Sequence, residues 1–542
     1  MAKYNEKKKE TLPTEINKMG EKAFKLDPKE ELVATVLTTF IQKSYYESES
    51  EVLNRIKDNM AKCDPLFVAK LAVYTRNEAN MRSSSHVLAA ELAQRAAGQE
   101  WARRFYEKII VRPDDMSEIV AYYKNIMKQS KFSSAMRAGF KKRLEKLDAY
   151  LIDKYKMKNR EISLIDLVNL FHPASNKKNE KAFELLVKNN GKGIGELYAS
   201  KILEKEMTAA GKSDKDINVA KKEAITSVLE NTAGMPIFNL LRNLRNIILY
   251  APDKISDAIK QLTTFEKIKN SRLLLFRFLS AYNEISKMTH GSESEKITFE
   301  DEINTQKVDV ITFNENKGKI LDAIEKAIEL SCVNIPVLEG RTTVLIDHSG
   351  SMRGDGGGHS LVSALSHTRS SDIANVFASM LIKYQPSVYV GLFGDKLINF
   401  DVDRDKRIIE TARLMHSIGE GCGGGTEAGI YNFLNEVIKN KKRIDNIIIF
   451  SDQVIGDGCG WYGRSDVSRS GKFGELFKKF RINYPGTKVV SVDIHQTDGT
   501  SVFNKKYGVT QVAGWSDKIF DIIGAGTVGY KALIEEIEKI EI

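Results

Sequence analysis

The stretch VLIDHSGSM, residues 344–352, decides the fold class of the C-terminal part of this chain. It opens as a short apolar, β-branched run, which is typical of a buried strand, and then turns abruptly polar. Similar runs recur further along, each ending in polar or acidic residues: SVYVGLFGD (387–395), NIIIFSD (446–452) and KVVSVDI (488–494). Helical patterns separate these runs. Buried strands that alternate with helices predict a parallel α/β sheet of the Rossmann-like type.

Oxygen-bearing side chains follow the predicted strands. Asp347, Ser349 and Ser351 alternate directly after the first strand, so one carboxylate and two hydroxyl groups can face the same way. Thr426 in GCGGGTEAG and Asp452 in FSDQ lie in what we expect to be two later strand-end loops. Ligands bind at the carboxyl ends of the strands in such sheets. Hydroxyl and carboxylate oxygens favour Mg²⁺ or another hard divalent cation over zinc or iron.

This D-x-S-x-S…T…D pattern resembles the metal-ion-dependent adhesion site of von Willebrand factor A domains. The resemblance implies an open metal position that is filled by water or by a partner's acidic side chain, and therefore binding rather than catalysis. The alternatives are ordinary polar turn residues, or an A-type fold with an unused metal site. His348 is expected to be a surface residue or to lie behind the ligands.

The rest of the chain follows a different pattern. From about Lys25 to Tyr282, apolar residues recur with helical spacing, which predicts a HEAT-like array of helix pairs. Residues 284–317 read as irregular, and one more helix is expected over residues 318–333. A chain of 542 residues exceeds a single core. We therefore predict two domains, a helical part over 1–335 and the α/β part over 336–542.

Positive charge is confined to the predicted helical part. Residues 336–542 hold 25 basic and 25 acidic side chains, so the whole net charge of +10 falls within residues 1–335. A localised basic excess indicates an anionic partner, with nucleic acid as the leading candidate. The four cysteines form no CxxC pair, and neither a signal peptide nor a membrane-spanning run is apparent. These features favour a cytoplasmic protein without membrane contact.

The densest basic run covers residues 131–160, where ten basic residues stand against three acidic ones. It includes Arg137, Lys141 and Lys142, and then Lys154 and Lys158, which would share a helix face if the helix continued through them. The alternative is a plain solvated helix face. Arg82 with His86, and Arg242 with Arg245, are further RNA-binding candidates for which a structural role remains open.

Four segments resemble signatures of the TROVE module of the Ro ribonucleoprotein family: LAVYTRNEANMRSSSHVLAAELA, KYKMKNREISLIDLVNLFHPAS, GMPIFNLLRNLRNI and SRLLLFRFLSAY. In that family a ring of helical repeats precedes a von Willebrand factor A-like domain, which is the order found here. The resemblance implies binding of small noncoding Y RNA at Lys154, Lys158 and His172. It also implies entry of the single-stranded 3′ ends of misfolded RNA into a central hole. Members of that family commonly have arginine at the position of Lys158. Lysine keeps the positive charge, but its ammonium group cannot bind a phosphate in the bidentate way that a guanidinium can.

The leading hypothesis is a non-catalytic RNA-binding protein in RNA quality control, acting with an exoribonuclease such as polynucleotide phosphorylase. One competitor is a protein-interaction scaffold that uses Mg²⁺ to grip an acidic partner. Another is an Mg²⁺-dependent phosphohydrolase or nuclease, although the sequence has no GxxxxGK[ST], HExxH or GxSxG motif.

Overall fold

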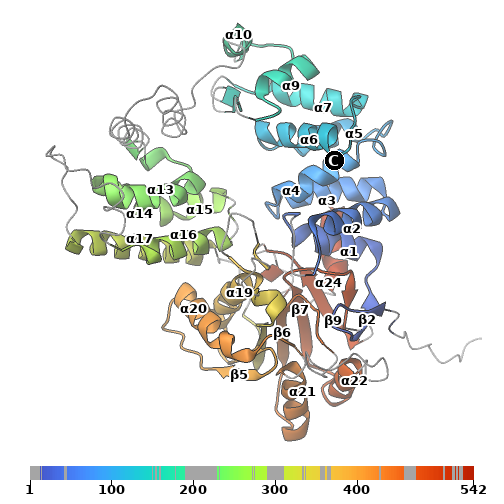
Figure 1. Cartoon of the computed structure of the whole chain (residues 1–542), viewed down its shortest axis with the longest axis vertical. Helices are drawn as coiled ribbons and strands as arrows, with labels where there is room; N and C mark the ends of the chain where they lie inside the picture. The colour runs from blue at the N-terminus through green and yellow to red at the C-terminus, as the bar shows by residue number, and fades with distance from the viewer. Residues whose placement is uncertain are drawn as a thin grey trace, which may run out of the picture. The chain divides into compact units, whose positions relative to one another are not determined.

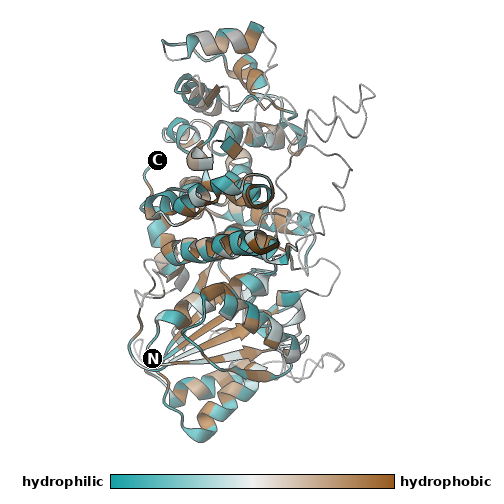
Figure 2. Ribbon diagram, turned by 90° about the vertical axis from the view of Figure 1, so that its left-hand side faces the viewer, coloured by the Kyte–Doolittle hydropathy of each residue, from teal (hydrophilic) through white to brown (hydrophobic). Residues whose placement is uncertain are grey.

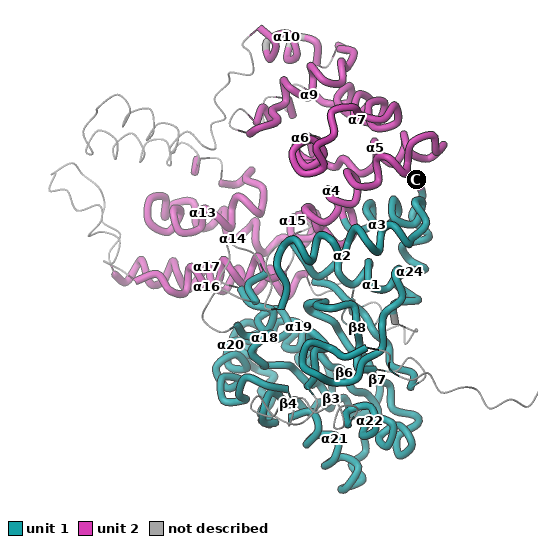
Figure 3. The backbone as a smooth tube through the Cα atoms, turned by 45° about the vertical axis from the view of Figure 1, so that its right-hand side comes forward, with its two compact units in different colours: residues 1–75, 334–541 teal, residues 76–333, 542 magenta. Residues whose placement is uncertain are grey.

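The computed structural model contains two compact units, formed by residues 1–75 with 334–541 and by residues 76–333 with 542 (Figure 3). It describes residues 13, 15–41, 46–148, 151–152, 155–157, 160–177, 179–188, 229–230, 232–271, 273, 275–289, 310–331, 335, 337–354, 360–362, 368–426, 429–456, 472–503, 507–515, 519–520, 523 and 529–542. Figure 1 labels elements of both units where there is room, and the units are described separately below.

A six-stranded sheet forms the centre of the first unit. Its strand order is β5-β4-β3-β6-β7-β9, in which only the β4–β5 pair is antiparallel. The strands are β3 (Thr342–Asp347), β4 (Val388–Phe393), β5 (Leu397–Phe400), β6 (Asn446–Ser451), β7 (Lys488–Asp493) and β9 (Val509–Ala513). The four predicted runs form β3, β4, β6 and β7, so the α/β fold class is confirmed. β5 and β9 were not anticipated from the sequence.

Helices pack against this sheet and bury it. They are α18 (Gly350–Arg353), α19 (Ser370–Tyr384), α20 (Ile408–Gly419), η4 (Glu420–Cys422), α21 (Gly429–Asn440), α22 (Lys472–Asn483) and α24 (Gly529–Glu538). One core joins Leu345 and Ile447 of the sheet to an aromatic cluster that includes Phe433, Phe473 and Phe477. Burial on both sides explains why the strand sequences are continuously apolar, which Figure 2 shows as brown segments.

The N-terminal segment belongs to this same unit. It comprises β1 (Glu15–Ile16), β2 (Lys22–Lys25), α1 (Pro28–Leu37), α2 (Glu49–Lys62) and most of α3 (Pro65–Asn77). β2 pairs antiparallel with β8 (Thr500–Ser501), and Leu26 and Ala34 pack with Ala513 and Tyr530. The compact units therefore differ from the predicted sequence boundary at 335/336, because residues 1–75 fold with the sheet.

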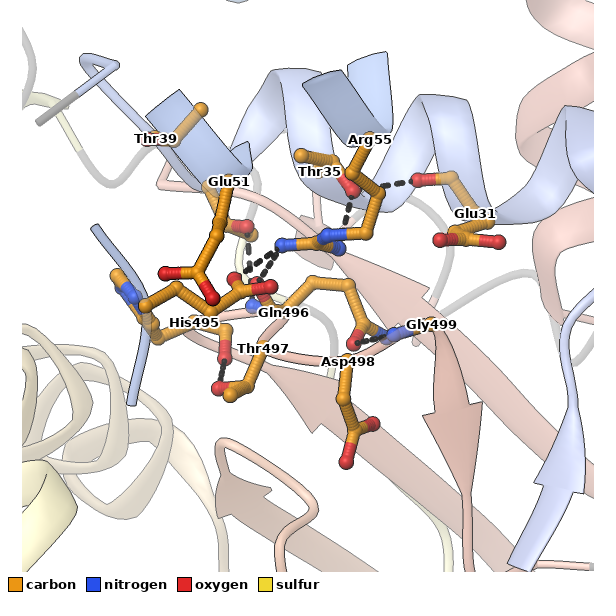
Figure 4. Close-up of polar contacts among 12 residues, drawn as sticks. Glu31, Thr35, Thr39, Glu51, Arg55, His495, Gln496, Thr497, Asp498 and Gly499 are labelled. Carbon is orange, nitrogen blue, oxygen red and sulfur yellow. Dashed lines mark hydrogen bonds and ion pairs between the residues drawn. The ribbon is translucent and has the colours of Figure 1, made fainter. Parts of the chain in front are cut away.

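Arg55 on α2 fixes these helices to the sheet (Figure 4). Its guanidinium donates hydrogen bonds to Thr35 Oγ1, at 2.7 Å, and to the carbonyl oxygen of Gln496, at 3.0 Å. It also forms a 2.6 Å ion pair with the buried Glu47. One side chain thus connects α1, α2 and the loop that follows β7.

The second unit is helical. Its elements are α4 (Arg82–Glu91), α5 (Ala102–Lys108), α6 (Pro113–Asn125), α7 (Ser134–Glu145), α9 (Leu164–Phe171), α10 (Glu180–Lys188), η2 (Thr232–Gly234), α13 (Ile237–Tyr250), η3 (Pro252–Lys254), α14 (Ile255–Leu262), α15 (Phe265–Ser271), α16 (Leu275–Lys287) and α17 (Val310–Ser331). α4 packs on α6, α5 on α7, and α16 on α17. Paired amphipathic helices confirm the predicted helical class.

Capping residues mark where the helices begin more accurately than the spacing of apolar residues does. Ser163 and Asp166 form a capping box at the start of α9, and Asp27 and Glu30 form another at α1. The long helix near residue 318 begins already at Val310, so the C-terminal end of the segment predicted to be irregular is helical.

Candidate functional site

Asp347, Ser349 and Ser351 occupy the tip of β3 and the first turn of α18. Ser349 Oγ and Ser351 Oγ lie 3.1 Å apart, and the Ser349 main-chain N–H donates to Asp347 Oδ1 at 2.8 Å. All three residues are buried. The alternation that the sequence suggested therefore brings a carboxylate and two hydroxyl groups together.

Asp452 completes the carboxylate pair from the neighbouring strand. It follows β6 and accepts a hydrogen bond from the Val454 main-chain N–H at 3.0 Å, and the nearby Ser351 hydroxyl group opposes the rise of its pKa. In the described part of the chain, no lysine, arginine or histidine forms an ion pair with Asp347 or Asp452. Burial raises the pKa of Asp347, while burial and the charge of Asp347 raise the pKa of Asp452 to about 7.

Thr426 reaches the site from a different kind of loop than expected. It lies between η4 and α21 rather than directly after a strand, so the predicted strand-end position is wrong. Its Oγ1 accepts a 2.7 Å hydrogen bond from Gly456 N–H, which ties it to the loop containing Asp452. The preceding glycines are held by Asp395, whose carboxylate accepts from Gly424 N–H and Gly425 N–H at 3.0 and 3.1 Å.

Two supporting residues were missed in the sequence. Ser451 Oγ donates to Asp347 Oδ2 at 2.6 Å, and Asp395 positions the glycine loop. Both stand at strand ends within runs that were already recognised, so their position was the available signal. His348, which was expected at the surface or behind the ligands, is fully buried, and its Nε2 lies 2.9 Å from Asn375 Oδ1.

The site has the chemistry of a hard-cation site. Burial disfavours the ionised form of both carboxyl groups, and the charge of Asp347 adds to this effect at Asp452. A divalent cation would stabilise the ionised form of both carboxyl groups. The hydroxyl groups of Ser349, Ser351 and Thr426 could serve as its neutral oxygen ligands. The five residues therefore fit the metal that the resemblance implies.

Of the three residues that the resemblance assigns to Y RNA binding, the structure describes His172. Lys154 and Lys158 lie outside the described residues, but Met157 between them has a φ of 52°. A left-handed residue interrupts an α-helix, so the expectation of one shared helix face is wrong. His172 is exposed at the C-cap of α9, with a φ of 46°.

The candidates on α7 are exposed but differ in their partners. Lys142 pairs with Glu107 at 2.9 Å. Arg137 and Lys141, one turn apart, form no ion pair with any residue that the structure describes. These two side chains are therefore available to an external anion.

Arg82 is part of an internal network rather than an open surface. It binds Asp114 at 2.9 Å and Asp115 at 3.1 Å. Asp115 is fully buried and also accepts from Arg76 and, depending on the tautomer, His86, both at 2.9 Å. These partners hold the pKa of Asp115 well below its usual range despite its burial. The geometry favours the structural role for Arg82.

Comparisons with known proteins match the helical part and the fold. A family model described as TROVE domain matches residues 32–232, which include two of the four signature segments. Telomerase protein component 1 of Rattus norvegicus is 22% identical over 108 residues, which make up 19% of this chain and 4% of that protein. The chain thus spans a small fraction of that relative's length.

A solved structure extends the likeness over most of the chain. The Ro (Rsr) protein of Deinococcus radiodurans matches with a TM-score of 0.53 and 13% identity, covering 92% of this chain and 100% of that one. At this identity the match concerns the fold. In the described part of the chain, no helix is long and apolar enough to cross a membrane.

Proposed function

We propose that this chain, a TROVE-domain protein with the fold of a Ro protein, is a non-catalytic RNA-binding protein. The observation that carries the proposal is the location of the charge: the whole excess of ten positive charges lies in residues 1–335, which contain the TROVE match. Basic side chains bind phosphates in a sequence-tolerant, salt-sensitive way. Shape and single-stranded segments then provide the selection that is usual for RNA.

The proposed ligands are a small Y-like RNA and misfolded RNA with a single-stranded 3′ end. Lys154, Lys158 and His172 would contact the former, with Arg137 and Lys141 adding exposed positive charge on α7. The proposal includes a cytoplasmic location and delivery of RNA to an exoribonuclease such as polynucleotide phosphorylase. The A-type domain would bind Mg²⁺ through Asp347, Ser349, Ser351, Thr426 and Asp452.

The test compares two charge-matched double variants. Arg137→Ala with Lys141→Ala removes two unpaired cations, whereas Lys319→Ala with Lys326→Ala removes two lysines that pair within α17. Gel shifts and anisotropy titrations use a Y-like RNA and a 3′-tailed misfolded RNA at several salt concentrations. We expect the first variant to lose affinity and to reduce the logarithmic salt slope by about 1–2. Binding that is undetectable or insensitive to salt would contradict the proposal.

A second candidate function is an Mg²⁺-dependent scaffold for an acidic protein partner. The buried carboxylate–hydroxyl cluster supports it, because a cation there could accept one more carboxylate. This function predicts capture of a protein that is lost with chelator and in Asp347→Ala, from preparations free of RNA. Cleavage of labelled RNA that is abolished by Asp452→Ala would instead identify a nuclease.

A further inference from the structure

Phe238 on α13 is a partly exposed aromatic side chain with two arginines close to its ring. It is 40% exposed, although its neighbours Ile237 and Leu240 are buried. The guanidinium carbon of Arg242, one turn further along α13, lies 5.9 Å from the centre of the ring. The guanidinium carbon of Arg277, on α16, also lies 5.9 Å from it.

The position of Phe238 on its helix is not that of a core residue. The buried stripe of α13 includes Leu240, Leu244 and Ile248, whereas Phe238, Arg242 and Arg245 recur on the exposed face. α13 contains no acidic residue. An apolar ring thus lies on an exposed helix face that also carries two arginines, where it gains little from burial.

We propose that Phe238, Arg242 and Arg277 form a base-stacking platform for single-stranded RNA. A nucleobase packs against the exposed part of the phenyl ring, and the two guanidinium groups over the ring bind the flanking phosphates. Stacking on an aromatic ring tolerates any base, since every base has a π-face. The platform selects single strands, because the base faces inside a duplex are already stacked.

The platform rests on the proposed RNA-binding function and adds a recognition element to it. Lysines and arginines alone bind single-stranded and double-stranded RNA through the same phosphates. A partly exposed ring close to two guanidiniums adds a contact that only an unpaired base can make. Single-stranded RNA, rather than a peptide, is the occupant, because the surface combines aromatic area with positive charge and α13 supplies no acidic side chain.

The experiment measures binding of fluorescent single-stranded octanucleotides and of an RNA duplex to the full chain. The variants are Phe238→Leu, Phe238→Trp and Arg242→Gln, with Tyr384→Leu as a control for an aromatic residue that is also 40% exposed. We expect Phe238→Leu to weaken single-strand binding about tenfold without changing the salt slope, because no counterion is released by a phenyl ring. Phe238→Trp should bind at least as tightly as the wild type, and Arg242→Gln should lower both affinity and slope.

A covalent readout locates the base directly. An oligonucleotide carrying 5-iodouridine is irradiated in complex with the protein, and the crosslinked peptide is identified by mass spectrometry. A crosslink at Phe238 supports the platform. Thermal unfolding and circular dichroism of Phe238→Leu establish that the variant is folded.

Two failures have separate meanings. If the wild type binds RNA while Phe238→Leu binds it equally well, the platform is wrong and the proposed function stands. The platform is equally wrong if Phe238→Leu weakens duplex and single-strand binding to the same extent. If the wild type binds none of the RNAs, the proposed function itself is wrong.

Discussion

Arg55 donates a hydrogen bond to the main-chain carbonyl oxygen of Gln496, 3.0 Å away, although 441 positions separate the two residues in the sequence. The same guanidinium pairs with Glu47, whose side chain is only 7% exposed. The first two long helices of the chain are therefore attached to the carboxyl end of β7. The attachment depends on a charge pair that is almost completely removed from water.

Replacing Arg55 with Met is expected to destabilise this attachment by about 3–5 kcal/mol, because Glu47 is left buried without its partner. Hydrogen exchange of α1 and α2 measures the loss of protection. Adding Glu47→Leu to Arg55→Met removes the stranded charge and should restore much of the protection. Unchanged exchange in the single variant would mean that the ion pair contributes nothing to the attachment.

The carboxylate pair of the candidate metal site should lower the stability of the protein when no cation is bound and raise it when Mg²⁺ is bound. Folding raises the pKa of Asp452 to about 7, so its ionised form costs stability above that pH and the cost disappears as pH falls towards 4. At pH 8 with chelator, Asp452→Asn should raise the free energy of unfolding by roughly 2–4 kcal/mol.

Added Mg²⁺ should stabilise the wild type and leave Asp452→Asn unaffected. At a hundredfold excess over the dissociation constant the gain is about 2.7 kcal/mol. Calorimetric titration and thermal unfolding measure both effects, and Asp401→Asn, at an exposed carboxylate outside the ligand set, serves as a control. A wild type that neither binds Mg²⁺ nor gains stability from it would contradict the assignment of a cation site.

Gly419 lies against the ring of His348. A Cβ atom at position 419 would sit 2.0 Å from His348 Nδ1, so Gly419→Ala forces a fully buried ring to move. We expect a loss of at least about 2 kcal/mol in the free energy of unfolding. Gly474→Ala is the matched control, because nothing lies within 4 Å of its Cβ position in α22 and the change should stabilise by up to about 1 kcal/mol. Similar stability of the two variants would contradict the close packing.

His495 predicts a loss of stability in mild acid. Burial, together with the nearby charge of Arg55, lowers its pKa to about 4. In the unfolded chain this imidazole takes up a proton below about pH 6.5, whereas in the folded chain it stays neutral down to about pH 4. The free energy of unfolding therefore decreases as the pH falls from about 6.5 to 4. His495→Gln should reduce this fall by about 1–2 kcal/mol at pH 5 in denaturant titrations. A pH profile that is identical in the variant would exclude His495 as its source.

Arg82 should affect stability rather than RNA affinity. Arg82→Gln removes hydrogen bonds to Asp114 and the buried Asp115, at a cost of about 1.5–3 kcal/mol in the helical unit. Its dissociation constant for single-stranded RNA should stay within about twofold of the wild type under conditions where the variant is folded. A large loss of RNA affinity in a fully folded variant would contradict this prediction and indicate that Arg82 contacts RNA.

Local pattern was sufficient for part of the fold and of the candidate site. Continuous apolar runs identified β3, β4, β6 and β7, because buried parallel strands leave no polar face. The alternation of Asp347, Ser349 and Ser351 placed their side chains together, because residues two apart in an extended segment point the same way. β9 was not found, since its sequence VTQVA has a polar centre.

Long-range contacts were beyond the reach of such patterns. Thr426 belongs to the site through Gly456 and through a loop held by Asp395, none of which its own neighbourhood in the sequence specifies. Arg82 looked like any basic residue near a helix start until Asp114 and Asp115 were found around it. The helix expected through Lys154 and Lys158 fails at Met157, where the backbone turns left-handed.

The sequence by itself determined the two kinds of structure, the confinement of positive charge to residues 1–335 and the choice of five candidate oxygen ligands. These properties depend on composition and on spacings of a few residues. Only the tertiary structure decided that residues 1–75 fold with the sheet, that Arg82 is neutralised internally and that the partly exposed Phe238 lies close to two guanidiniums. Those outcomes depend on which residues, distant in the sequence, come into contact and become buried. A local sequence pattern does not specify such contacts.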